Sequence, residues 1–231
     1  AAGNASEKAV TLAILNLDEV APTITSGGTA SAINENSGAG QVIYTATADD
    51  TADISGGVTF SLKSGAGDAG LFTINGSTGA VTLTGNPNYE AKSSYSFTVV
   101  ATDAAGNKSE QVVALVINNL DEVAPTITSG GTASAINENS GAGQVVYTAT
   151  ATDTADISGG VTFSLKSGAG DAGLFTINSS TGAVTLTGNP DYEAKSSYSF
   201  TVVATDAAGN ASEKAVTLAI LNLDEVAPTI T

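Results

Sequence analysis

The sequence predicts an all-β protein made of tandem seven-stranded, immunoglobulin-like Greek-key β-sandwiches that follow one another in a linear array. Two observations predict this fold class. A unit of about 100 residues, the size of one domain, occurs twice in the chain. Each copy holds seven short runs rich in Val, Thr, Ile, Tyr and Phe, separated by turns rich in Gly, Asn and Asp, and no stretch keeps a helical period.

The repeat is nearly exact. Residues 18–120 align with residues 121–223 without a gap, at a period of 103 residues and with 10 differences. Residues 1–17 are identical to residues 207–223. We therefore expect the C-terminal strand of a preceding repeat at 1–17, repeat 1 at 18–120, repeat 2 at 121–223, and a linker with the start of a following repeat at 224–231.

Alternation of side chains supports the strand assignment. Tyr95, Phe97 and Val99 fall on one face of an extended segment, whereas Ser96 and Thr98 fall on the other. The expected strands of repeat 1 are 23–25 (running on toward residue 33), 41–47, 58–62, 71–74, 80–84, 95–102 and 111–117.

The composition excludes several functional classes. The chain of 231 residues has 23 acidic residues, seven lysines and no arginine, which gives a net charge of −16. This charge repels nucleic acids and anionic membranes, and no apolar run of about 18 residues is present that would insert into a bilayer. Cys and His are absent, so disulfides, zinc–thiolate sites and His-based catalysis are excluded.

Strand parity places the acidic side chains at two ends of each sandwich. Because successive strands run up and down, the turns that hold Glu35 and Glu90 meet at one end, here named the lower end. The turns that hold Asp50, Asp53 and Asp103 meet at the opposite, upper end. Paired carboxylates can hydrolyse glycosides, but no aromatic platform for a sugar accompanies these acids, and we expect no enzymatic activity.

The acidic connector between repeats joins one lower end to the next upper end. Stacking repeat 1 on repeat 2 would therefore gather seven carboxylates, with two amides nearby. These residues of the middle joint are Glu35, Glu90, Asp121, Glu122, Asp153, Asp156 and Asp206, with Asn88 and Asn119.

Calcium is the counter-charge that this set of side chains favours. It takes six to eight oxygen ligands with tolerant geometry, whereas Mg²⁺ uses fewer protein ligands and Zn²⁺ prefers His and Cys. Seven acids exceed the need of one ion, which allows more than one ion per joint. The alternative is that the acids only keep the sheet edges and loop ends solvated.

The motifs at these positions resemble those of cadherin repeats, in particular the bacterial cadherin-like extender domains of large repetitive RTX/Lap-type surface adhesins. The resemblance covers both full repeats. In chain order the motifs are Asn34-Glu35-Asn36 and Asn137-Glu138-Asn139, the acid pairs Asp50/Asp53 and Asp153/Asp156, Asn88-Tyr89-Glu90 and Asp191-Tyr192-Glu193, Ala101-Thr102-Asp103 and Ala204-Thr205-Asp206, and the linker from Asn119 to Pro125.

The resemblance implies Ca²⁺ bound between successive repeats. The middle joint is the only one with both of its repeats in this sequence. Two partial joints flank it. The N-terminal partial joint comprises Asn16, Asp18, Glu19, Asp50, Asp53 and Asp103, and the C-terminal one comprises Glu138, Asp191, Glu193, Asn222, Asp224 and Glu225.

The sequence departs from the family pattern at three places. The paired Asp residues after the second strand are three positions apart rather than two. The linker exchanges Asn and Asp at Asn119 and Asp121. Asn88 stands where the family has an Asp, and a neutral amide coordinates more weakly than a carboxylate.

These observations predict a mechanical function. We expect a calcium-rigidified spacer of a secreted bacterial cell-surface adhesin, which contacts neighbouring repeats of its own chain and projects a distal binding domain. A second hypothesis is a direct adhesive module with calcium-dependent homophilic contacts through sandwich faces. The Thr-rich strands also leave ice or sugar binding open.

The leading segment is a strand without its sandwich. Val10, Leu12 and Ile14 would form its core-facing side. It either frays or adds to the edge of a neighbour, in which case homotypic strand contacts would form.

Overall fold

A computed structural model describes residues 2–54, 56–157 and 159–229. Residues 1, 230 and 231, the outermost positions of the expected flanking segments, lie outside the described residues. The chain forms two compact units, unit 1 (Ala1–Asn119) and unit 2 (Leu120–Thr231). Each unit is a β-sandwich, and the described residues form no α-helix, so the expected all-β tandem fold is confirmed.

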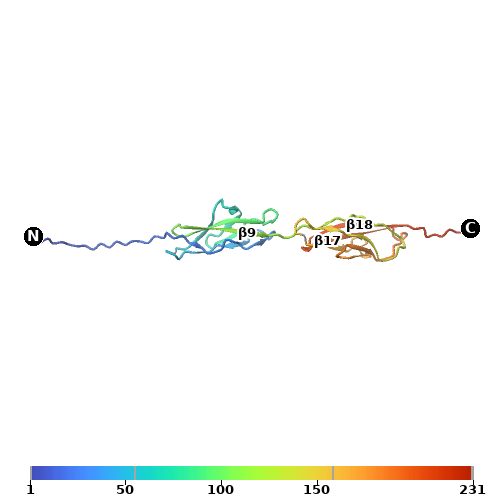
Figure 1. Ribbon diagram of the computed structural model, residues 1–231, viewed down its shortest axis with the longest axis horizontal. Coiled ribbons are helices and arrows are strands. Elements are labelled where there is room, and N and C mark those ends of the chain that lie inside the picture. Colours follow the sequence, from blue (N-terminus) through green and yellow to red (C-terminus); the bar gives the residue numbers. More distant parts are fainter. Residues whose placement is uncertain (1, 55, 158, 230–231) are drawn as a thin grey trace. The chain divides into compact units, whose positions relative to one another are not determined.

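The described residues of unit 1 form nine strands. They are β1 (Thr23–Ile24), β2 (Ile33–Asn34), β3 (Val42–Thr45), β4 (Ala48–Asp49), β5 (Thr59–Leu62), β6 (Phe72–Ile74), β7 (Ala80–Leu83), β8 (Ser94–Thr102) and β9 (Lys108–Asn118), with a single 3₁₀ turn, η1 (Ala69–Leu71), before β6. The longest are β8 and β9, and Figure 1 labels β9.

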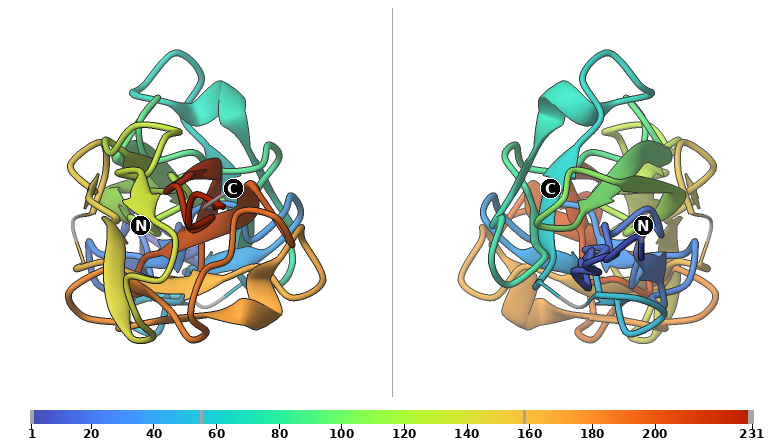
Figure 2. Two further views of the ribbon diagram at one scale, coloured as in Figure 1. Left: turned by 90° about the vertical axis from the view of Figure 1, so that its right-hand side faces the viewer. Right: turned by 90° about the vertical axis from the view of Figure 1, so that its left-hand side faces the viewer.

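Two sheets form the sandwich of unit 1. One has the strand order β2-β9-β8-β5 and the other β3-β7-β6. The long strands β8 and β9 pair antiparallel over nine residue pairs and are seen lengthwise in Figure 1 and nearly end-on in Figure 2. The residues just before and just after each of these strands therefore lie at the ends of the sandwich.

The first two expected strands each divide into two. β1 pairs antiparallel with β4, whereas β2 runs parallel to β9, with Ile33 opposite Ile117. Gly27 and Gly28 lie between β1 and β2, where the chain passes from one pairing to the other. The expected continuous strand 41–47 is wrong in detail, because β3 ends at Thr45 and pairing resumes only in β4.

Unit 2 repeats this topology with the orders β11-β18-β17-β14 and β12-β16-β15 and the pair β10–β13. Its strands are β10 (Thr126–Ile127), β11 (Ile136–Asn137), β12 (Gln144–Thr148), β13 (Ala151–Thr152), β14 (Thr162–Leu165), β15 (Phe175–Ile177), β16 (Ala183–Leu186), β17 (Ser197–Thr205) and β18 (Ala211–Leu221), with η2 (Ala172–Leu174) before β15.

Each unit has a hydrophobic core of its own. In unit 1 the core centres on Phe97, which is 1% exposed and packs against Phe72 and Tyr44 at ring-centroid distances of 4.7 and 6.0 Å. Phe200 takes the same place in unit 2. A separate core is typical of an autonomous domain. We therefore expect the core of each unit to hold the end loops of that unit in place without the other unit.

The turn before β7 brings backbone close to backbone. Gly79 has φ +72°, and a Cβ built on it would lie 2.2 Å from the carbonyl oxygen of Ala46. We expect Gly79→Ala to lower the free energy of unfolding of unit 1 by about 2 kcal/mol or more, because strain and a clash add. Urea unfolding checks this, with Gly85→Ala as the control, since Gly85 has open space around it. A destabilisation no larger than that of the control would contradict the prediction.

The leading segment carries no strand among residues 2–22. Val10, Leu12 and Ile14 are 87%, 84% and 88% exposed, whereas the identical residues Val216, Leu218 and Ile220 of β18 are buried in the core of unit 2. The segment thus has the side chains of a core strand and no sheet of its own in this structure.

Candidate metal-binding clusters at the sandwich ends

Acidic side chains gather at both ends of each sandwich. At the upper end of unit 1, Asp18, Asp50 and Asp103 each place a carboxylate oxygen within 4.8 Å of the others. We call these three residues the upper cluster of unit 1. They come from the segment before β1, the loop after β4 and the end of β8, so strands distant in sequence assemble them.

The upper end of unit 2 has the same arrangement. Asp121, Asp153 and Asp206 form the upper cluster of unit 2, with the same mutual spacing. Asp153 and Asp206 are only 8% and 7% exposed. The Oδ2 atom of Asp206 is buried and accepts no hydrogen bond among the described residues. A buried, unbonded carboxylate oxygen is costly unless a cation faces it.

The pKa values of two upper-cluster carboxylates of unit 2 shift in opposite directions. Although burial raises it, the neighbouring side-chain amide of Asn210 and the hydrogen bonds that Oδ1 accepts from the backbone N–H groups of Asn210 and Gly209 keep the pKa of Asp206 below its ordinary value. Burial, followed by the charges of Asp206, Asp153 and Asp156, raises the pKa of Asp121. The raised pKa of Asp121 reflects the like charges that crowd together at this end of unit 2.

Two asparagines outside the predicted ligand set support these clusters. Asn107 donates from Nδ2 to Asp103 Oδ2 (2.9 Å) and to the carbonyl oxygen of Asp18 (3.0 Å). Asn210 donates to the carbonyl oxygen of Asp121 (2.8 Å). They fix the acidic segment before each sandwich against the end of β8 or β17. Their position four residues after Asp103 or Asp206, in a turn, was the signal that could have identified them.

The lower ends hold a buried glutamate each. Glu35 and Glu138 are both 1% exposed. In unit 2, Glu138, Asp191 and Glu193 lie within 4.8 Å of one another and form the lower cluster of unit 2. In unit 1, carboxylate oxygens of Glu35 and Glu90 are equally close. Asn88 stands two residues before Glu90, at the position of Asp191 in unit 2, and we name these three residues the lower cluster of unit 1.

The pKa values of the two glutamates in the lower cluster of unit 2 shift in opposite directions. Hydrogen bonds from the backbone N–H of Leu223 (2.6 Å) and of Tyr192 (2.9 Å) hold the pKa of Glu138 below its ordinary value. Backbone hydrogen bonding lowers the pKa of Glu193, but burial and the charges of Glu138 and Glu225 raise it overall. Closely spaced carboxylate oxygens, with no basic side chain among the cluster members, match the ligand chemistry of a hard divalent cation.

The remaining predicted residues lie around the clusters and outside these close sets. Asp53 Oδ1 accepts a hydrogen bond from Asn16 (2.7 Å), and Asn222 donates to Glu193 Oε1 (3.2 Å). Asp224 Oδ1 accepts from the backbone of Val226 (3.1 Å). Asp156 and Asn119 are half-buried, and Glu19 is exposed. Glu225 accepts a hydrogen bond from Asn139.

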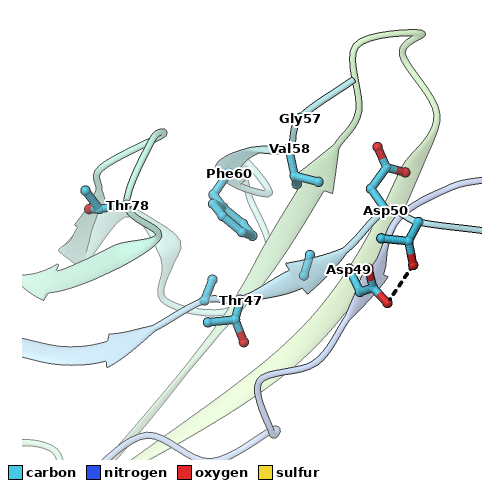
Figure 3. A pocket seen from close by; sticks show the side chains of 10 residues that line it. Thr47, Asp49, Asp50, Gly57, Val58, Phe60 and Thr78 are labelled. Carbon is cyan, nitrogen blue, oxygen red and sulfur yellow. Dashed lines mark hydrogen bonds between the residues drawn. The ribbon is translucent and has the colours of Figure 1, made fainter. Parts of the chain in front are cut away.

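Adjacent acids in the loop after β4 take different roles. Asp49 and Asp50 border a cavity of about 480 Å³ that Phe60 and Thr78 also line. Figure 3 shows that the carboxylate of Asp49 accepts a hydrogen bond from Thr51 (3.1 Å), while that of Asp50 points elsewhere. Asp50, and not Asp49, therefore belongs to the upper cluster. Repeat 2 has Thr152 in place of Asp49.

Among the parts of the chain that the structure describes, no helix has the length and apolar character needed to cross a membrane.

Comparisons with known proteins point to one family. The cadherin domain profile matches residues 29–118 and 132–223, one match in each unit. Protocadherin Fat 4 of Mus musculus is 31% identical over 175 residues, which cover 74% of this chain and 4% of that protein. Cadherin-23 of Mus musculus is 32% identical over 200 residues, covering 84% of this chain and 6% of that protein.

Solved structures agree on the fold. Human protocadherin-24 EC1-2 superposes with a TM-score of 0.66 at 21% identity, covering 89% of this chain and 99% of that one. Mouse cadherin-23 EC22-24 gives a TM-score of 0.62 at 24% identity, covering 89% and 68%. At these identities the likeness concerns the sandwich fold alone.

Proposed function

Since this chain belongs to the cadherin family, with one cadherin domain in each unit, we propose that its repeats are calcium-rigidified spacers of a secreted cell-surface adhesin, which project a distal binding domain. Cadherin domains are non-enzymatic adhesion modules, so the expectation that the chain is not an enzyme is confirmed. The cadherin relatives of this chain are extracellular, and we propose an extracellular location for this chain as well.

The observation that carries the proposal is the buried, unbonded Oδ2 atom of Asp206 within the upper cluster of unit 2. Such an oxygen favours a cation, and an all-oxygen set of carboxylates and carbonyls favours Ca²⁺ over Zn²⁺. The equivalent three acids gather in unit 1, where Asp103 Oδ2 accepts a hydrogen bond from Asn107 and the buried, unbonded oxygen is Oδ2 of Asp50. Each upper cluster therefore contains one such oxygen, although a different acid supplies it.

Bound calcium would supply positive charge that removes the repulsion within each cluster. Residues around the clusters would hold the carboxylates in position. Asn107 and Asn210 position the acidic segments, and the backbone N–H groups of Tyr89 and Tyr192 orient the buried glutamates. The sequence motifs imply seven acids at the middle joint with two amides beside them: Glu35, Glu90, Asp121, Glu122, Asp153, Asp156 and Asp206, with Asn88 and Asn119.

The bacterial adhesin part of the proposal rests on the motif resemblance described above, and the near-identity of the repeats supports the spacer role. Only 10 of 103 positions differ between the repeats. The relatives reported above are animal proteins, and the chain spans 4% of protocadherin Fat 4. Near-identical copies suit a spacer, in which the number of repeats matters more than any individual face. A surface specialised for one ligand would need only one copy to carry it.

Small-angle scattering of the chain with calcium and with chelator tests the proposal. We expect a larger radius of gyration and a narrower distribution of conformations with calcium, because ligands drawn from successive repeats and their linker would be held by the same ions. Equal dimensions in both buffers would overturn the spacer function. Calcium-dependent dimers in sedimentation would instead favour the adhesive alternative, for which exposed Val112 (62%) and Val116 (50%) on β9 offer an apolar face.

A further inference from the structure

The acidic turns at the two lower ends differ at one position. In unit 1 the carboxylate of Glu35 accepts a hydrogen bond from the backbone N–H of Tyr89 (2.8 Å), and in unit 2 Glu138 accepts the same bond from Tyr192 (2.9 Å). The glutamates have the same burial. Residues 86–92 and 189–195 are otherwise identical, but residue 88 is Asn where residue 191 is Asp.

Asn88 and Asp191 begin the same tight turn. Asn88 Oδ1 accepts a hydrogen bond from the backbone N–H of Ala91 (2.6 Å), and Asp191 Oδ1 accepts one from Ala194 (2.8 Å). Their carbonyl oxygens also accept equivalent bonds from residues 92 and 195, at 3.0 and 2.9 Å. The shared contact fixes how each side chain is rotated, so the second terminal atom occupies an equivalent place in both units.

That second atom differs in chemistry. In Asp191 it is another carboxylate oxygen, an acceptor and a metal ligand. In Asn88 it is an NH₂ group, which carries two protons and cannot coordinate a cation. Turning the amide over would offer its oxygen to the cluster but would point NH₂ at the N–H of Ala91, which loses the hydrogen bond of the turn. Asn88 thus serves the turn or a cation, whereas Asp191 serves both.

We propose that Asn88 is a non-ligand, and that the lower cluster of unit 1 is therefore a weaker calcium site than the lower cluster of unit 2. The inference rests on the proposed function and adds a regulation to it. Repeats with Asn and repeats with Asp at this position give an array sites of two grades. As calcium falls, the lower end of unit 1 releases its ion first, which defines where the array loosens.

Reciprocal substitutions test the grading. Calcium binding to the whole chain is followed by calorimetry, and hydrogen exchange read by mass spectrometry assigns protection to residues near 35 and 90 or near 138 and 193. We expect Asn88→Asp to tighten the lower site of unit 1 on the order of tenfold, and Asp191→Asn to weaken that of unit 2 similarly, since calcium affinity follows the charge of the ligand set. Each substituted residue is native in the other repeat, so both variants are expected to fold.

Lys108→Ala is the matched control. It changes the net charge as Asn88→Asp does, Ala is the native residue at the equivalent position 211, and Lys108 is exposed at the opposite end of β9. Its affinity at the lower clusters is expected to stay within twofold of the parent chain. Asp191→Asn without effect, or a control that tightens the site as much as Asn88→Asp, would overturn the grading. Calcium-dependent stiffening would survive that result, whereas absence of calcium binding in every variant would remove the proposed function itself.

Discussion

Calcium at 100 times its dissociation constant is expected to raise the melting temperature of unit 2 by roughly 10–20 °C, and Asp153→Ala is expected to remove most of that increase. A ligand that binds only the folded state at this concentration adds about 2.7 kcal/mol. For a domain of about 100 residues, each kcal/mol shifts the melting temperature by roughly 4–8 °C. The unfolded chain cannot assemble acids from three separate segments, so it does not compete for the ion.

Asp153 is the residue to change because it is buried beside Asp206, where little water reaches its carboxylate. It is 8% exposed, and its Oδ2 accepts a long hydrogen bond from Gly159 (3.4 Å). In chelator, removal of one of three crowded carboxylates relieves repulsion. The expected signature is therefore a large loss of the calcium increment, with a small change in the metal-free protein.

Calorimetric melting with and without calcium measures the increment, and hydrogen exchange resolves unit 2 from unit 1. Asp49→Thr is the control, since it removes one acid and puts in place the residue that repeat 2 carries at that position. Asp49 is engaged with Thr51 and lies outside the upper cluster. If Asp153→Ala kept the full increment, or if Asp49→Thr lost as much, calcium would not be acting through the upper clusters.

Strand parity was enough to place the acids because it depends only on how many strands separate two turns. Asp50 and Asp103 follow the second and sixth expected strands, and the structure brings them within 4.8 Å together with Asp18. The metal itself stays a prediction. Parity is insensitive to where a strand breaks, which is why the error at 41–47 did not misplace Asp50.

The contact of Asn107 and the orientation of the Asn88 amide could not be predicted from the sequence, because they depend on side-chain rotation and on which backbone groups lie nearby. Asn107 could be read as a turn residue, but its contact with the carbonyl of Asp18 needs the folded end of the sandwich. The orientation of the Asn88 amide is set by the N–H of Ala91, which the residue type alone does not reveal. A sequence shows which atoms are available, and the turn geometry decides which of them face the cluster.

The independence of the two cores leads to the second large effect. Phe97→Ala is expected to lower the free energy of unfolding of unit 1 by about 3–5 kcal/mol, since truncation of a buried aromatic residue leaves a cavity and removes ring contacts with Phe72 and Tyr44. Unit 2 is expected to keep its stability in metal-free buffer, because its core cluster contains no residue of unit 1.

Urea unfolding followed by hydrogen exchange separates the two units in this experiment, and Phe60→Ala, at the half-buried rim of the same core, is the control with a smaller expected loss. Equal destabilisation of unit 2 in chelator would contradict independent cores. Repeating the experiment with calcium tests whether bound ions make the stability of unit 2 depend on that of unit 1. If a spacer shares its ions between neighbouring repeats, the loss in unit 1 should weaken calcium binding to the linker segment and lower the calcium increment of unit 2, whereas ions held within single repeats would leave that increment unchanged.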